Sequence, residues 1–466
     1  MTGTSPITAE RIAAGIAVEE AAYVAAHPRC AELAALGREH MPGGVPMSWM
    51  AKWPGPFPLH VAEAHGAHFT CADGARHVDL CLGDTGAMCG HSPEAVARAV
   101  AAQAARGITS MLPTADAAAV ASELTRRFAG ASGAVRRWQF TLTATDANRH
   151  VLRYARFATG RPKVLVFDHC YHGTVDETFA TLGEPGADGE RPVVARHGNI
   201  GPPVDLDVTT VVVPFNDVAA LERALGRGDV AAVLAEPALT NIGIVLPEPG
   251  FHEALRGLTR RHGTYLVLDE THTLCAGPGG AVRAWGLDPD AVVVGKTIGG
   301  GVPIGAFGMT EQLAAASMGK VELEQIDIGG IGGTLAGNAL SLAAARATLG
   351  EVLVDDAFDA MAGLATRWTA GVQGVIDGAG LPWHVTQLGA RAEYAFGPMA
   401  PRDGAEAAAD DDFPLQQYLH LQALTHGVLL TPFHNMALMS PATTDADVDA
   451  HTAAFEQAAA FLVGTS

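Results

Sequence analysis

Short apolar runs rich in β-branched residues alternate with amphipathic segments from about residue 130 to residue 310 of this 466-residue chain. Such alternation is typical of strand-helix units on a mostly parallel sheet, so we expect a large α/β domain with a seven-stranded sheet. The predicted helices cover residues 147–157, 217–225 after a capping Asn216, and 252–262 before Gly263. The predicted strands cover residues 138–143, 164–168, 210–213, 231–235, 265–269, 291–295 and 304–309.

Both ends of the chain predict a second, smaller α+β domain. Residues 59–80 predict a strand meander with its turn at Asp73-Gly74. The downstream segments are predicted helices at 349–369 and 413–426, strands within 381–396, and an Ala- and Asp-rich surface loop at 404–412. The expected organisation is an N-terminal segment with part of the small domain over residues 1–80, a large domain over 81–345 and a C-terminal small domain over 346–466.

A lysine stands at the end of one predicted strand. Lys296 follows the apolar run Ala291-Val-Val-Val-Gly295 and precedes Thr-Ile-Gly-Gly-Gly301, and it is one of only four lysines in the chain. Burial there would lower the pKa of the amine, and a neutral amine can attack a carbonyl to form a Schiff base. A lysine that simply extends from a strand end into solvent is the alternative, and the residue alone favours it.

Three other polar groups follow predicted strands, where ligands of a parallel sheet gather. Asp269 closes an apolar run, and a buried carboxylate there needs a cation such as a protonated ring nitrogen, or else a structural ion pair. Thr143-Ala144-Thr145-Asp146 opens a helix, so it either binds a phosphate or simply caps that helix. Tyr171 in Tyr171-His172-Gly173 could stack on a flat cofactor.

Composition narrows the function classes. Acidic residues exceed basic ones by 50 to 30, and this formal charge of −20 disfavours binding to nucleic acid or an anionic membrane. No apolar run reaches the length of a membrane span and the N-terminus lacks a secretory pattern, so we expect a cytoplasmic protein. The six cysteines show no C-x-x-C spacing, so no zinc site or other metal is expected.

The order of these segments is more specific than any one of them. The other stretches with matching spacing are Pro42-Gly-Gly-Val45, Gly66-Ala-His-Phe-Thr70, Gly90-His-Ser-Pro93, Glu236-Pro237 and Thr334-Leu-Ala-Gly-Asn338. Over about residues 40–460 the chain resembles the class III pyridoxal-phosphate-dependent aminotransferases, and in particular the glutamate-1-semialdehyde aminomutase-like branch. The resemblance implies the PLP-dependent transferase fold of type I.

The resemblance also implies a cofactor, pyridoxal 5'-phosphate (PLP), and roles for individual residues. Lys296 matches the lysine that forms the Schiff base and moves the proton, and Asp269 matches the carboxylate that keeps the ring nitrogen protonated. Thr334 matches a threonine that reaches the phosphate of a neighbouring subunit, which implies a homodimer with its active site at the interface. The remaining cofactor-binding residues implied in this way are Thr143, Ala144, Thr145, Tyr171, His172, Glu236, Thr271 and His272.

Two departures from the family pattern concern binding. The family's Ser-Gly-Thr-Glu-Ala phosphate signature is Thr143-Ala-Thr-Asp-Ala147 here, and alanine in place of glycine restricts the backbone. In the aminomutase branch an arginine recognises the substrate carboxylate, and the corresponding position is Met50, which argues against the aminomutase substrate. The predicted substrate-pocket residues are Trp49, Met50, Trp53, Asp84, Arg391, Arg402, Phe433 and His434, with the two arginines as possible carboxylate partners.

The cofactor permits several reactions, because the pocket rather than the lysine selects the bond that breaks. Transamination is the favoured prediction, between an amine or a β- or bulky amino acid and an oxo-acid acceptor. A PLP-dependent aminomutase or racemase is the alternative, and it would share every cofactor residue. A non-catalytic ligand-binding protein of the same fold is a third possibility that Lys296 and Asp269 argue against.

Overall fold

The computed structural model describes residues 7–187, 189–318 and 330–464. The chain divides into two compact units. The larger comprises Glu94–Asp355 and Pro401–Ala409, and the smaller comprises the described residues up to Pro93, Asp356–Ala400 and the chain from Asp410 onward. The smaller unit is thus assembled from both chain ends.

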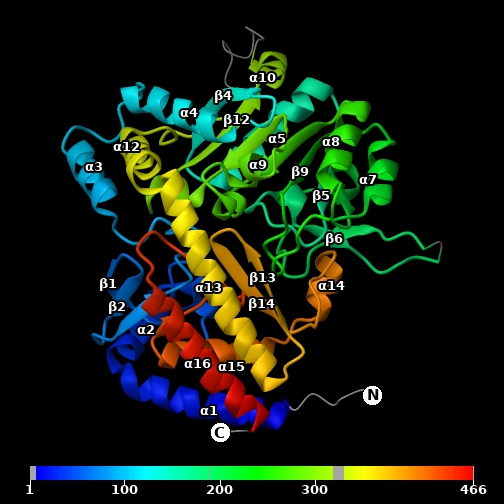
Figure 1. The fold of residues 1–466 in the computed structure, drawn as a ribbon. Helices are drawn as coiled ribbons and strands as arrows, with labels where there is room; N and C mark the ends of the chain where they lie inside the picture. The colour runs from blue at the N-terminus through cyan, green and yellow to red at the C-terminus, as the bar shows by residue number, and fades with distance from the viewer. Residues whose placement is uncertain (1–6, 188, 319–329, 465–466) are drawn as a thin grey trace. The chain divides into compact units, whose positions relative to one another are not determined.

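A seven-stranded sheet forms the centre of the larger unit (Figure 1). All neighbouring pairs are parallel except those of β12, which runs antiparallel to both of its neighbours. The prediction of a mostly parallel seven-stranded sheet is therefore confirmed. In spatial order the strands are β4 (Val135–Thr141), β12 (Gly305–Thr310), β11 (Ala291–Val294), β10 (Tyr265–Asp269), β9 (Val230–Ala235), β5 (Lys163–Phe167) and β8 (Thr210–Val213).

Helices of the larger unit pack on this sheet, and α5 (Ala144–Thr159) lies across its central strands β9 to β12. Its buried residues, Ala147, Val151, Leu152 and Ala155, form the apolar stripe that faces the sheet. The other α-helices are α3 (Glu94–Ala104), α4 (Ala115–Phe128), α6 (Leu206–Thr209), α7 (Val218–Leu225), α8 (Phe251–His262), α9 (Gly280–Ala284), α10 (Glu311–Met318), α12 (Ala339–Ala347) and α14 (Gly404–Ala409). Shorter elements are the hairpin β6 (Ala180–Leu182) and β7 (Val193–Ala195), and η3 (Asp176–Thr178), η4 (Thr273–Ala276), η5 (Lys296–Gly299) and η6 (Thr348–Val352).

The smaller unit contains two sheets, ordered β1-β2-β3-β15 and β13-β14-β16. The first includes the meander that the sequence predicts, with Gly74 at φ +84° in the turn between β2 and β3. The strands of the two sheets are β1 (Val61–His65), β2 (His68–Cys71), β3 (Arg76–Asp79), β13 (His384–Leu388), β14 (Arg391–Ala395), β15 (Val428–Leu429) and β16 (Met436–Leu438). Its helices are α1 (Ala9–Ala26), α2 (Pro28–His40), η1 (Pro42–Gly44), η2 (Ser48–Lys52), α13 (Asp355–Ala379), α15 (Phe413–Thr425) and α16 (Asp445–Val463).

Three local predictions were wrong. Residues 404–412 are not simply a loop, because α14 forms there with the Asp403 carboxylate accepting from the N–H groups of Ala405 and Glu406. The helix predicted over 349–369 is interrupted between η6 and α13. The cap of α7 is Asp217, which accepts from the N–H of Ala220, and not Asn216.

Within the part of the chain that the structure describes, each helix is too short or too polar to cross a bilayer.

Candidate active site

The site forms where β11 ends against the start of α5. Gly295 follows β11, and a Cβ placed on it would lie 2.8 Å from the Cβ of Ala144 and 3.2 Å from its backbone nitrogen. Because residue 295 has no side chain, the methyl group of Ala144 fits, although the family carries glycine at that position. Lys296 is the next residue, so its amine originates beside the first turn of α5.

The first turn of α5 offers backbone N–H groups to an anion. Thr143 is the N-cap, and its hydroxyl accepts from the N–H of Asp146 at 3.1 Å. The other N–H groups of a first helical turn have no partner within the helix, and the helix dipole favours a negative charge there. A phosphate at this place, as the sequence predicts, would accept hydrogen bonds from these N–H groups.

The loop after β5 packs on the same helical turn. Its Gly173 has φ +75°, and an added Cβ would lie 2.0 Å from the Thr145 hydroxyl oxygen, so only glycine fits. The Thr145 hydroxyl also accepts from the N–H of Thr174 at 3.2 Å. This contact fixes the loop that carries Tyr171 and His172.

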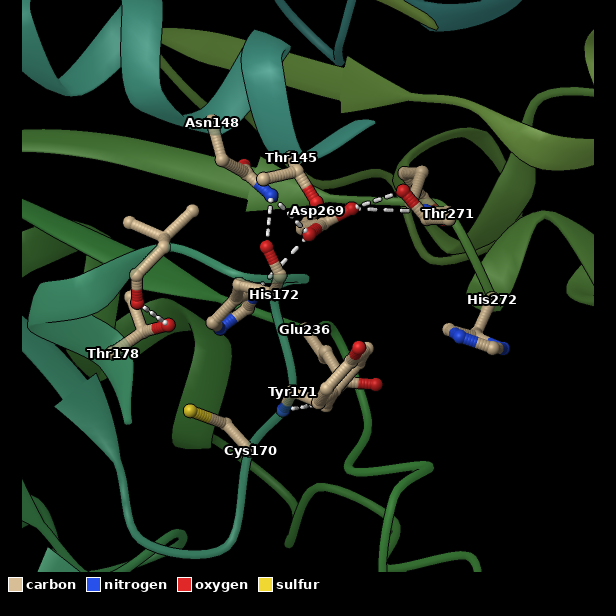
Figure 2. A network of polar contacts seen from close by, with 12 residues as sticks. Thr145, Asn148, Cys170, Tyr171, His172, Thr178, Glu236, Asp269, Thr271 and His272 are labelled. Atoms are coloured by element: carbon tan, nitrogen blue, oxygen red, sulfur yellow. Dashed lines mark hydrogen bonds and ion pairs between the residues drawn. The ribbon is translucent and has the colours of Figure 1, made fainter. Parts of the chain in front are cut away.

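Asp269 lies at the end of β10 in the centre of a buried hydrogen-bond network (Figure 2). One carboxylate oxygen accepts from the Thr271 hydroxyl at 2.6 Å and from the Thr271 N–H at 3.1 Å. The other accepts from Nδ2 of Asn148 at 2.8 Å and from Nδ1 of His172 at 2.9 Å. The carboxylate is therefore held in one orientation from both sides.

This network keeps a charge pair inside the protein. Burial would raise the pKa of Asp269, but the hydrogen bond and charge of His172, with hydrogen bonds from Thr271 and Asn148, hold that pKa below its ordinary value. Burial would lower the pKa of His172, but Cys170 and Asp269 raise it to about 10. At neutral pH the pair is an imidazolium and a carboxylate.

Lys296 has an unusual backbone conformation and a close polar neighbour. Its φ of +49° lies in the left-handed region, which costs a residue other than glycine about 1 kcal/mol or more and is found most often at functional sites. Its Nζ lies 2.9 Å from Nε2 of His272. His272 follows Asp269 by three residues, so the loop after β10 places this imidazole beside the lysine amine.

Glu236 supports the tyrosine loop from β9. One of its carboxylate oxygens accepts from the N–H of Tyr171 at 3.1 Å, and the other accepts from the Thr240 hydroxyl. Burial raises the pKa of this carboxyl. Tyr171 itself is 36% exposed, so its ring has an accessible face.

The other predicted residues are divided between the two units. In the larger unit, Thr334 is exposed and lines an apolar cavity of about 640 Å³, and the exposed Arg402 pairs through Nε with Glu248 at 2.6 Å. In the smaller unit, Arg391 is fully buried and pairs with Glu393 at 3.0 Å, and His434 lies 3.6 Å from the same carboxylate. The remaining substrate-pocket residues, Trp49, Met50, Trp53, Asp84 and Phe433, also belong to the smaller unit.

Asn148 is a residue of this site that the sequence reasoning missed. It is fully buried and donates to both Asp269 and the carbonyl oxygen of His172. The signal was present in the sequence, because Asn148 is the polar residue within an otherwise apolar stripe that runs from Ala147 to Ala155.

The comparisons with known proteins agree with this geometry. The family model of class-III aminotransferases matches residues 49–459. A glutamate-1-semialdehyde 2,1-aminomutase of Chloroflexus aggregans is 34% identical over 91% of this chain and 95% of its own length. The crystal structure of a glutamate-1-semialdehyde-aminomutase from Pseudomonas aeruginosa PAO1 is 46% identical, with a TM-score of 0.93 over 98% of this chain and 99% of that one.

Fold and site together define a PLP-dependent enzyme of fold type I. The chain belongs to the class-III aminotransferase family. Its cofactor is pyridoxal 5'-phosphate, and a variant of the Pseudomonas relative has been solved in complex with PMP. The donor set fits that cofactor, since the start of α5 after β4, the amine of Lys296 after β11 and the buried carboxylate of Asp269 in β10 belong to the same sheet.

The predicted transamination, with its amino donor and oxo-acid acceptor, was wrong as the main reaction. The Chloroflexus and Pseudomonas relatives are both named as aminomutases, and both match almost the whole chain. An omega-transaminase from Sphaerobacter thermophilus is also similar, but at 30% identity and a TM-score of 0.83 over 93% of this chain and 98% of that one. The alternative in the sequence interpretation, the aminomutase, has the better support.

Proposed function

We propose that this chain is a PLP-dependent aminomutase of the glutamate-1-semialdehyde type, which moves an amino group between neighbouring carbons of one substrate molecule. For glutamate 1-semialdehyde, the amino group and the carbonyl oxygen exchange places between C2 and C1, so the product is 5-amino-4-oxopentanoate and no acceptor is consumed. The likeness to a solved aminomutase at 46% identity over 98% of this chain carries the proposal.

When bound, PLP supplies the electron sink and the carrier for the amino group. The residues proposed to act with it are Lys296, whose Nζ attaches the cofactor and moves the proton, and Asp269, whose carboxylate holds a proton on the ring nitrogen. His272 Nε2 is within hydrogen-bond distance of Nζ and is placed to exchange a proton with it. The amides of Ala144 and Thr145 would hold the phosphate.

The Asp269 carboxylate can accept a hydrogen bond from the protonated ring nitrogen of the cofactor only if one of its four present donors moves away. The two oxygens of a carboxylate have about four acceptor positions, and Thr271, Asn148 and His172 occupy them. The hydroxyl of Thr271 can leave by rotation of its side chain, and the threonine would then pack on one ring face while Tyr171 covers the other. Glu236 is proposed to hold Tyr171 in place through its N–H.

Thr334 supports the proposal of a homodimer. It lines the cavity of about 640 Å³ beside Met111 and Leu112, whose side chains are 79% and 75% exposed. Large apolar side chains on a surface favour contact with another protein. A second copy of this chain would cover them, and Thr334 of each copy would serve the site of the other. All six cysteines lie in the described part of the chain and none forms a disulfide, which supports the proposed location in the cytoplasm.

The decisive experiment is a reaction without an acceptor. Purified enzyme with PLP is given glutamate 1-semialdehyde alone, and the product is followed by mass spectrometry and NMR. Stoichiometric isomer without added oxo acid supports the proposal. A product that forms only when pyruvate or 2-oxoglutarate is present, together with alanine or glutamate, would refute it.

A further inference from the structure

Four potential metal ligands lie close together within the smaller unit. His27 lies between α1 and α2, Cys30 in the first turn of α2, Cys71 at the end of β2, and Asp73 in the turn before β3. We call these four residues the His27 cluster. The sequence spacing gives no sign of it, because 41 positions separate the two cysteines and the fold alone brings them together.

The ligand atoms of the cluster face one another. Nδ1 of His27 lies 3.8 Å from Sγ of Cys71 and 3.9 Å from a carboxylate oxygen of Asp73, and the three ligand atoms all lie within 4.8 Å of each other. The sulfur of Cys30 accepts from the N–H of His60 at 3.3 Å, and the backbone N–H of Cys30 donates to the same Asp73 carboxylate. Ligands of a tetrahedral zinc ion lie roughly 3.3 to 3.7 Å apart, so side-chain shifts of up to about 1 Å would bring His27, Cys71 and Asp73 to these separations, and the side chain of Cys30 would turn in beside them.

The surrounding chain already holds the carboxylate in place. Asp73 accepts from the N–H of Arg29 at 2.7 Å through one oxygen and from the N–H of Cys30 at 3.0 Å through the other. Such contacts to the ligands of a metal fix their orientation. The oxygen that faces His27 accepts one backbone hydrogen bond, and a carboxylate oxygen has a second acceptor position for a cation.

Three of the four residues of the His27 cluster are buried. His27, Cys30 and Cys71 are 3%, 0% and 1% exposed, and they pack beside Tyr23 and Phe57 in an apolar cluster. Cysteine alone is common in such cores as a small apolar residue. The buried His27 and the partly buried Asp73 converge on these two thiols, and one cation would bind all four groups at once.

We propose that the His27 cluster binds one zinc ion with a structural role. The ligands are Nδ1 of His27, Sγ of Cys30, Sγ of Cys71 and a carboxylate oxygen of Asp73, the sulfur, nitrogen and oxygen donors that zinc prefers. Two Zn–S bonds form and the two thiol protons pass to solvent, with no change of oxidation state. Four protein ligands leave no position for a reacting molecule, so the ion joins α2 to the β2–β3 turn.

The test uses the full-length, untagged, PLP-loaded enzyme. Metal is removed with a chelator under reducing conditions, ZnCl₂ is added, the excess is dialysed away, and zinc per chain is measured by mass spectrometry. We expect about one zinc ion per chain, a lower melting temperature after chelation, and release of about two protons per zinc on addition. Proton release needs no variant, so its absence overturns the proposal even where a variant fails to fold.

Two cluster variants and one matched control complete the design. Cys71→Ser and Asp73→Asn should lose the zinc and the effect of chelation on the melting temperature. Cys89→Ser, which changes another buried cysteine of the same unit, should keep both. Circular dichroism and cofactor absorbance report folding independently of activity. Zinc retained equally by all variants would mean an adventitious ion only, and zinc absent from the wild type would refute the site.

Discussion

Nδ1 of His172 donates to a carboxylate oxygen of Asp269 across 2.9 Å, and both side chains are buried. The imidazolium therefore keeps the carboxylate ionised at the place where a ring cation is expected. The pair also contributes to stability, because removal of either partner leaves an uncompensated charge in the protein interior.

The His172 pair gives stability a defined pH dependence. The folded-state pKa of His172, about 10, is above the ordinary value of 6.5, so its stabilisation is complete below about pH 6.5 and is lost as the pH rises through 10. The pKa of Asp269 is lowered, so its part is present above about pH 4 and is lost in stronger acid.

We therefore expect His172→Gln to lower the free energy of unfolding by roughly 3 to 5 kcal/mol near pH 6. The difference from the wild type should shrink steadily towards pH 10. Urea unfolding of both proteins at pH 6, 8 and 10 measures it, with His197→Gln as the control. A difference that stays constant over this range would contradict the assigned charge pair.

Lys296→Ala should reduce turnover by at least about a thousandfold, because the variant lacks the amine proposed to attach the cofactor and move the proton. Mass spectrometry after borohydride reduction should find the cofactor on residue 296 in the wild type and on no lysine in the variant. Lys163→Ala is the matched control, since Lys163 forms an ion pair with Asp229 at 3.1 Å in the same unit. Loss of cofactor attachment in the control instead would reject the assignment.

Gly295→Ala tests the contact between β11 and α5. The new methyl group would meet that of Ala144, and we expect a loss of roughly 1 to 3 kcal/mol of stability together with weaker PLP binding. The double variant Gly295→Ala with Ala144→Gly should recover part of both. Chemical unfolding and cofactor titration of the wild type, the two single variants and the double variant measure the coupling free energy between the two positions. Strictly additive effects would show that the two positions do not touch.

Met50→Arg tests the substrate proposal. In the aminomutase branch an arginine at this position recognises the substrate carboxylate, so restoring the cation should lower KM for glutamate 1-semialdehyde by about tenfold with kcat nearly unchanged. Met47→Arg, an exposed position shortly before it, is the control. An unchanged or higher KM in Met50→Arg alone would show that the carboxylate is bound elsewhere.

Strand positions were largely predictable because their local patterns are strong. The all-β-branched run from Thr210 to Val213 and the run from Tyr265 to Asp269 became strands with the predicted bounds. Apolar strands in a sheet covered by helices leave few alternatives. The site residues after these strands could be named, because strand ends converge on one edge of a parallel sheet.

The local features that the sequence did not predict depend mostly on tertiary contacts. The helix predicted over residues 349–369 breaks because the buried guanidinium of Arg127 takes the carbonyl oxygens of Leu349 and Leu353, at 2.8 and 2.9 Å. The alanine-rich segment at 404–409 has high helix propensity, and the prediction gave its acidic neighbours too much weight. The His27 cluster joins residues far apart in sequence, which local spacing cannot reveal.

The touching of Gly295 and Ala144 has a mechanical consequence. In the proposed site, Lys296 would attach the cofactor and the start of α5 would hold its phosphate, so both attachment points would belong to one packed junction and would keep a nearly constant separation. A cofactor held at both ends in this way would keep its position from one catalytic cycle to the next. Substrate could then bind and product could leave without any rearrangement of the cofactor.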